Sequence, residues 1–181
     1  MRPVMKLYGL ELVIGPAGAA ETGGEQLMFK AIVDRFAEAV ESGEPDRIAG
    51  LFSEEGIYHD LVYGDFRGRA AIAGMFRDRW FRDAGRFQWE MLDPIFRDGV
   101  GYAHWLHSFD LKNPTGRQRV IVDGASQFVI GADGLIERYR EWTEGFGALL
   151  RAGASQSTID FIMYRHDDKV RALADPLRHD I

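Results

Sequence analysis

The stretch FAEAVESGEPDRIAGLFSEEGIYHDLVYGDFRGRAAIAGMF, residues 36–76, carries the pattern that decides the fold. It opens inside a run of apolar residues spaced three and four positions apart, which predicts an amphipathic helix over 26–42. Ser42 and Gly43 end this helix, and Pro45 suits the first turn of a short second helix. We therefore expect the main domain to begin with two helices.

The second half of the same stretch predicts a strand and a third helix. Residues 56–61 have the composition of a brief strand. Gly64 and Gly68 bracket a predicted turn, and the spacing typical of a helix returns over 71–80. Three helices are therefore expected before the β-rich part of the chain.

Beyond Gly85 the chain changes to long strands separated by hairpin-type turns. The separators are rich in Gly, Asn and Asp, which tolerate the positive φ angles of tight turns. Helices followed by consecutive hairpin strands predict the α+β class rather than a βαβ wind. The predicted strands are 87–96, 100–111, 119–130 and 135–143.

Composition indicates one globular domain and excludes several classes of site and partner. The chain has 181 residues, 46% of them hydrophobic and 28% charged, and this size suffices for folding without disulfides or a structural metal. It contains no cysteine, which removes disulfides, thiol nucleophiles and Cys-ligated zinc together. The net charge of −6 has the wrong sign for a nucleic-acid partner.

Two extensions flank the predicted main domain of residues 26–150. Residues 1–25 form an N-terminal extension whose Gly-rich part, 15–24, predicts a flexible linker. Its apolar run is too short to span a membrane, and the absence of cysteine favours a cytoplasmic protein. Residues 151–181 predict a C-terminal helical extension, with an apolar stripe at helical spacing over 157–173.

The quoted stretch, followed by strands that end in GADGLIERYREW at residues 131–142, resembles the nuclear transport factor 2-like superfamily. That superfamily includes SnoaL-like polyketide cyclases, ketosteroid isomerases and limonene epoxide hydrolases. The resemblance covers residues 26–150 and implies a cone, a curved antiparallel sheet packed on three N-terminal helices, of the cystatin-like type. It also implies a deep, mostly apolar pocket for a small hydrophobic molecule and a homodimer. One such fold serves many reactions, so the resemblance predicts the fold better than the reaction.

Asp60 is the leading candidate for a catalytic residue. Strand alternation places Tyr58 and Asp60 on one face and His59 on the other. The resemblance implies a general base at Asp60, as in the isomerases, or a water held by Tyr58 and Asp60, as in the epoxide hydrolases. A carboxylate in an apolar pocket becomes more basic because desolvation disfavours its charge. The alternative is an Asp at the strand end that caps the turn at Gly64.

Glu141 is the second acidic candidate, on the strand that closes the domain. It matches an acid that the epoxide hydrolases use in their triad, and the alternative is an ion pair with Arg138 or Arg140. That triad also needs an Arg and an Asp two residues apart on the middle strand. Counting back from the Pro114-Thr115-Gly116 turn, which the resemblance implies is shared with that family, places Leu106 and Ser108 at these two positions. The resemblance therefore does not extend to the complete triad.

Two histidines lie three residues apart on the middle strand and face opposite ways. The same count puts His104 on the concave face with Tyr102 and Leu106, where it could pair with Asp60. This resembles the polyketide cyclases, which are thought to close a ring with an acid and a histidine. A hydrogen-bonded histidine in the pocket wall is the alternative. We expect His107 to be structural, and the opposed rings exclude a two-His metal site.

The remaining candidates line the expected pocket. Phe36 and Ser126 match the isomerase positions of the oxyanion-hole Tyr and Asp, and neither residue supplies that donor pair. Tyr139 shares a strand face with Glu141, and Trp80 is one of several aromatic residues that can wall an aromatic or polycyclic ligand. The predicted pocket residues are Phe36, Trp80, Tyr102, Leu106, Ser126 and Tyr139.

The sequence therefore predicts an acid/base enzyme of SnoaL-like type, without metal or other cofactor, that acts on a small hydrophobic or polyketide-like substrate. Cyclase, isomerase or dehydratase chemistry would fit, with Asp60, His104, Glu141 and Tyr58 as the catalytic residues. Two alternatives stay open: a non-catalytic small-molecule-binding or assembly module, and an epoxide-hydrolase-like hydrolase with an altered triad. No Walker-type or dinucleotide glycine pattern supports a nucleotide cofactor.

Overall fold

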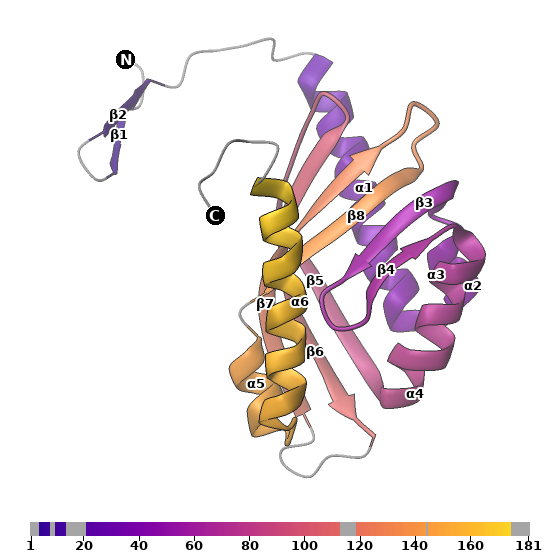
Figure 1. Ribbon diagram of the computed structural model, residues 1–181. Helices are drawn as coiled ribbons and strands as arrows, with labels where there is room; N and C mark the ends of the chain where they lie inside the picture. Colours follow the sequence, from indigo (N-terminus) through magenta and orange to yellow (C-terminus); the bar gives the residue numbers. More distant parts are fainter. Residues whose placement is uncertain (1–3, 8–9, 14–20, 113–118, 144, 175–181) are drawn as a thin grey trace.

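The computed structural model describes residues 4–7, 10–13, 21–112, 119–143 and 145–174 (Figure 1). Helices and two short strand pairs make up the first half of the chain. Long strands followed by two helices make up the second half. The elements are β1 (Val4–Leu7), β2 (Leu10–Val13), α1 (Glu21–Ser42), α2 (Pro45–Ala49), β3 (Phe52–Asp60), β4 (Gly64–Arg67), α3 (Arg69–Met75), the π-helical turn η1 (Phe76–Trp80), α4 (Phe81–Asp83), β5 (Ala84–Arg97), β6 (Val100–Leu111), β7 (Arg119–Ile130), β8 (Ile136–Thr143), α5 (Phe146–Arg151) and α6 (Gln156–Ala174).

Six strands form the main sheet, in the order β4-β3-β8-β7-β6-β5, while β1 and β2 pair separately. Four of its five pairings are antiparallel, which confirms the α+β class, but β3 and β8 run parallel. The sequence predicted antiparallel strands throughout because hairpin turns join most of them. No hairpin joins β3 to β8, so their relative direction is set by the path of the chain between them.

Strand β5 bends where its pairing with β6 is interrupted. The register shifts twice, between Gly85 and Gln88 and between Leu92 and Ile95. A residue at positive φ lies within the second shift, Asp93 at 47°. Such bulges bend a strand and increase its twist, and here they curve the sheet into the expected cone.

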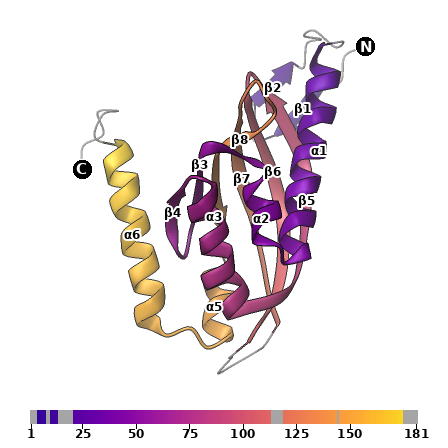
Figure 2. The same cartoon turned by 90° about the vertical axis from the view of Figure 1, so that its right-hand side faces the viewer.

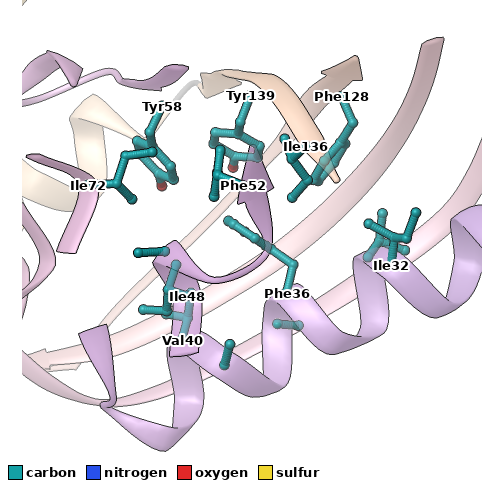
Figure 3. Close-up of a cluster of buried hydrophobic side chains, with 14 of the residues drawn as sticks. Ile32, Phe36, Val40, Ile48, Phe52, Tyr58, Ile72, Phe128, Ile136 and Tyr139 are labelled. Atoms are coloured by element: carbon teal, nitrogen blue, oxygen red, sulfur yellow. The ribbon is translucent and has the colours of Figure 1, made fainter. Parts of the chain in front are cut away.

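The helix predicted over 26–42 packs its apolar face on this sheet (Figure 3). It begins at Glu21, inside the stretch that was expected to be a linker. Phe36 is fully buried and meets Tyr139, Trp89 and Phe128 at ring distances of 5.0, 5.4 and 5.7 Å. An aromatic core therefore fills the space between α1 and the middle of the sheet.

Two further elements bear on the site. The turn expected between Gly64 and Gly68 contains the strand β4, which pairs with β3. Figure 2 shows α1 and α6 on opposite sides of the molecule, with α3 and strands between them. Among the helices that the structure describes, none has both the length and the apolar character needed to cross a bilayer.

Candidate functional site

An apolar cavity of about 190 Å³ is lined by strands of the main sheet, by the turn after β3 and by the C-terminal helices. Its walls come from the turn after β3, from η1, from strands β5 to β8 and from α5 and α6. Apolar walls with a few convergent polar groups are typical of small-molecule sites. The polar side chains that reach the cavity are Asp60, Tyr63, Asp83, His107, Glu141, Thr143 and Thr158.

Asp60 stands at the end of β3 and is 1% exposed. Its Oδ1 accepts the backbone N–H groups of Val62 at 2.7 Å and Tyr63 at 2.6 Å, which is the turn cap offered above as the alternative. Its Oδ2 accepts the indole N–H of Trp80 at 2.8 Å. Trp80 ends the π-helical turn, a form of helix that often marks functional sites. One carboxylate thus caps the turn and also lines the cavity.

Glu141 approaches the same turn from β8 and is 7% exposed. Its Oε1 accepts the backbone N–H of Leu61 at 3.2 Å, and its Oε2 accepts the hydroxyl of Tyr139 at 2.9 Å. No ion pair joins it to Arg138 or Arg140, so the alternative role proposed from the sequence is not observed. Glu141 therefore belongs to the cavity wall together with Asp60.

The two carboxyl groups differ in how well their negative charge is stabilised. Burial raises the pKa of Asp60, while three N–H donors and the charge of Arg165 oppose that rise. Burial, followed by the charge of Asp60, raises the pKa of Glu141 to about 8. With three donors against two, Asp60 is the better site for the charge and Glu141 for the proton at neutral pH.

A chain of buried hydrogen bonds leads to Glu141 from the middle of the sheet. Trp105 donates its indole N–H to Ser126 at 2.8 Å, Ser126 donates to the Tyr139 hydroxyl at 2.8 Å, and Tyr139 donates to Glu141. An indole nitrogen is only a donor, so Ser126 accepts from Trp105 and keeps its own O–H for the Tyr139 hydroxyl. Both oxygens of Glu141 therefore accept a hydrogen bond from the protein, and the carboxyl group also lines the cavity.

The orientation predicted for the two histidines of β6 is wrong. His107, expected to be structural, lines the cavity and is 4% exposed. Its ring stacks on Trp89 at 4.4 Å and on Trp80 at 5.5 Å, and burial lowers the pKa of His107 to about 3. His104 lies on the outer face with its side chain 49% exposed, 3.9 Å from Asp123. The count from the turn was off by one residue, and a shift of one residue inverts every side chain of a strand.

The same inversion moves Tyr102 and Leu106 to the outer face, where they are 46% and 42% exposed. Phe36 and Tyr58 are fully buried in the aromatic core and do not line the cavity. Ser126 and Tyr139 lie behind the cavity wall, in the hydrogen-bond chain just described. Of the ten predicted site residues, Asp60, Trp80 and Glu141 line the cavity.

Sequence reasoning named Trp105 only among the aromatic residues that could wall a ligand and missed His107 as a cavity residue, although the strand carried a signal for both. Its odd positions hold Trp105, His107 and Phe109, while its even positions include Ser108 and Asp110. The more apolar set faces inward, so β6 presents neither an Arg nor an Asp to the cavity. The part of the site contributed by α5 and α6 had no signal beyond the apolar stripe of the C-terminal helix.

No three His, Asp or Glu side chains within the described ranges gather as a metal site would require. Residues 33–139 match the family model described as a SnoaL-like domain. No curated protein matches the chain.

Several solved structures share the fold. A hypothetical protein with a ketosteroid isomerase-like fold from Catenulispora acidiphila DSM 44928, in complex with trimethylamine, has a TM-score of 0.62 at 18% identity and covers 68% of this chain and 93% of its own. An LEH-like epoxide hydrolase of M. tuberculosis has a TM-score of 0.59 at 18% identity, with coverages of 71% and 93%. SalBIII, an epoxide hydrolase/cyclase-like enzyme in pyran ring formation in polyether salinomycin, has a TM-score of 0.57 at 21% identity, with coverages of 66% and 92%.

These structural likenesses establish the fold, and identities this low leave the reaction open. The family match covers more than half of the residues. This chain therefore belongs to the SnoaL-like domain family, and so to the nuclear transport factor 2-like superfamily.

Proposed function

We propose that this protein is an acid/base enzyme that uses no metal or organic cofactor and acts on a small hydrophobic or polyketide-like molecule bound in the cavity. The observation that carries this proposal is the buried carboxyl pair, in which Asp60 is the better site for the charge and Glu141 for the proton. A base and an acid with separated pKa values, side by side on an apolar wall, are suited to coupled proton transfer.

In this mechanism Asp60 takes a proton from a carbon next to a carbonyl group, or from a hydroxyl group. Glu141 gives its proton to the oxygen on which negative charge develops. Tyr139 and the N–H of Leu61 then stabilise the carboxylate that Glu141 becomes. The same two transfers serve aldol-type cyclisation or loss of water. In isomerisation of a double bond, Asp60 then returns its proton to another carbon of the enol, and Glu141 takes back the proton from the enol oxygen.

An epoxide-hydrolase-like reaction is the less favoured chemistry. Two of the similar structures are described as epoxide hydrolase or epoxide hydrolase/cyclase-like. The inner face of β6 carries Trp105, His107 and Phe109, so the Arg and Asp expected for the full triad are missing there. A hydrolase would have to activate water with Asp60 and Glu141 alone.

The test is turnover of a panel of β-keto polyketide mimics, unsaturated ketones and epoxides, followed by mass spectrometry. For any compound converted, we expect Asp60→Asn and Glu141→Gln to lose about 10²- to 10⁴-fold in rate. His104→Gln, on the outer face, is the matched control and should stay near wild type. The rate should fall above about pH 8, as Glu141 loses its proton. Undiminished turnover by Asp60→Asn would refute the proposal.

The alternative of a non-catalytic binding module has one observation in its favour, because both oxygens of Asp60 already accept hydrogen bonds. Under that alternative Asp60 is a structural cap. A compound that raises the melting temperature, binds with measurable heat and emerges unchanged after long incubation would support the binding module over the enzyme.

We also propose that the protein is a homodimer, formed through the outer face of β5, β6 and β7. Monomers rarely expose a broad apolar patch, and this face exposes Ile95 at 68%, Tyr102 at 46% and Ile121 at 58%. Sedimentation velocity should give a dimer for the wild type and a monomer for Ile121→Glu. A wild-type monomer at micromolar concentration would contradict this part of the proposal.

A further inference from the structure

Helix α6 lies beyond the SnoaL-like match, which ends at residue 139, yet it forms one wall of the cavity. Ile159 and Ile162 are each 2% exposed, and Ile162 and Thr158 line the cavity. The outer side of the helix exposes Phe161 and Tyr164. The inner side of α6 thus supplies part of the cavity wall that the residues matched by the family model do not supply.

Arg165 links this helix to the turn that follows β3. Its Nη2 donates to the carbonyl oxygens of Leu61 and Val62, both at 2.6 Å. The N–H groups of the same two residues donate to Glu141 and Asp60 respectively. The turn therefore binds the guanidinium through its carbonyl groups and the carboxyl pair through its N–H groups.

We propose that Arg165 is a positioning residue of Asp60, and that docking of α6 completes the site. The carbonyl groups of Leu61 and Val62 share peptide planes with the N–H groups of Val62 and Tyr63, and both of these N–H groups donate to Asp60. The two bonds from Arg165 therefore fix the orientation of the N–H groups that hold Asp60. Without them, the turn would be free to rotate those N–H groups away. This inference rests on the proposed function for its catalytic meaning, while its structural content can be tested without a substrate.

The charge of Arg165 acts in the same direction as its hydrogen bonds. It lowers the pKa of Asp60 against the effect of burial, and so helps to keep the proton on Glu141. The other titratable groups coupled to Asp60 are Tyr58 on β3, Tyr63 in the turn, and Tyr139 and Glu141 on β8. Arg165 is the cation among the groups that act on Asp60.

The experiment is a carboxyl ¹³C NMR titration of the full chain, comparing the wild type with Arg165→Met and Arg165→Lys. We expect Arg165→Met to raise the Asp60 midpoint by about one pH unit and to bring it closer to that of Glu141. Arg165→Lys keeps the charge and two donors, so it should recover most of the difference. The matched control is Arg171→Met, which breaks only the exposed pair with Asp167 on the same helix.

An Asp60 midpoint that stays at the wild-type value in Arg165→Met would overturn the proposal, even if the variant is less stable. If Arg165→Met does not fold, Arg165→Gln removes the charge but keeps an amide NH₂ group, and its Asp60 midpoint is compared with the wild type in the same way. The titration separates this inference from the proposed function: an altered midpoint with no turnover of any compound supports Arg165 as a positioning residue and counts against the enzyme. With a converted compound, Arg165→Met should lower kcat more than it raises KM.

Discussion

The two faces of strand β6 carry similar residues and meet opposite surroundings. On the inner face Trp105 and His107 are 2% and 4% exposed, next to the cavity. On the outer face Tyr102 is 46% exposed and the His104 side chain 49% exposed. The aromatic ring and the imidazole recur on both faces, so residue type alone does not distinguish them.

Enclosure accounts for the difference. The inner histidine is stacked among indole rings and burial keeps it neutral, whereas the outer histidine lies in solvent near Asp123. The carboxyl pair depends on the same enclosure, because burial is the main cause that raises the pKa values of Asp60 and Glu141. Paired substitutions on the two faces therefore test whether enclosure controls stability and titration.

The largest expected effect comes from removing an aromatic ring on each face. Trp105→Ala deletes a buried indole and breaks the hydrogen-bond chain to Glu141, so it should lower the free energy of unfolding by about 3–5 kcal/mol. Tyr102→Ala, made together with Ile121→Glu and compared with Ile121→Glu alone so that the proposed dimer does not contribute, should cost less than about 1 kcal/mol. Urea denaturation measures both, and equal losses would contradict the assignment of the faces.

The next effect is a dependence of stability on pH. Below pH 4.5, the ordinary pKa of a glutamate, Glu141 is protonated in both folded and unfolded states. As the pH rises to about 8, the unfolded state releases this proton and the folded state retains it, so the wild type loses stability. Glu141→Gln cannot titrate and should gain on the order of 3 kcal/mol over the wild type between pH 5 and 8. Urea denaturation at the two pH values measures this, and a constant difference would exclude a raised pKa at Glu141.

A smaller effect of opposite sign is expected for the inner histidine. Above pH 6.5 His107 is neutral in both the folded and the unfolded state. Between pH 6.5 and about 3 the unfolded state binds a proton at His107 and the folded state does not. The wild type should therefore lose about 2 kcal/mol between pH 7.5 and 5 from this group. His107→Phe should abolish that loss, and His104→Phe should preserve it. Thermal unfolding at several pH values compares the three proteins. Loss of the effect in His104→Phe would show that His104, and not His107, is the enclosed histidine.

The smallest effect concerns neighbouring polar residues of β7. Ser126→Ala leaves the Trp105 indole N–H without its acceptor and should cost about 1–2 kcal/mol. Gln127, on the exposed side, donates to the Tyr102 hydroxyl, and Gln127→Ala should change stability by less than about 0.5 kcal/mol. Guanidinium denaturation measures the difference. Unchanged stability in Ser126→Ala would contradict a stabilising role for the hydrogen bonds that run from Trp105 to Glu141.

Much of this architecture was predictable from local patterns. The spacing of apolar residues gave the helix that ends at Ser42, and Asp98-Gly99 gave the hairpin between β5 and β6. Asp60 and Glu141 were predicted as site residues because they match acidic positions of the isomerases and epoxide hydrolases that the sequence resembles, and strand alternation indicated which residues share their faces. The face of β6 was predicted by counting back from the turn expected at residues 114–116, which lie outside the described residues, and an error of one residue in that count inverts the strand.

The sequence by itself determined the element order and the α+β class, because these follow from periodicity and turn chemistry within short segments, and its family resemblance indicated the two acidic residues. Tertiary structure decided which histidine is enclosed, the direction of β3 against β8, and the contact of Arg165 with a turn about a hundred residues earlier in the chain. Those features depend on long-range packing: a shift of one residue in register, or the docking of one helix, changes them without changing any local pattern.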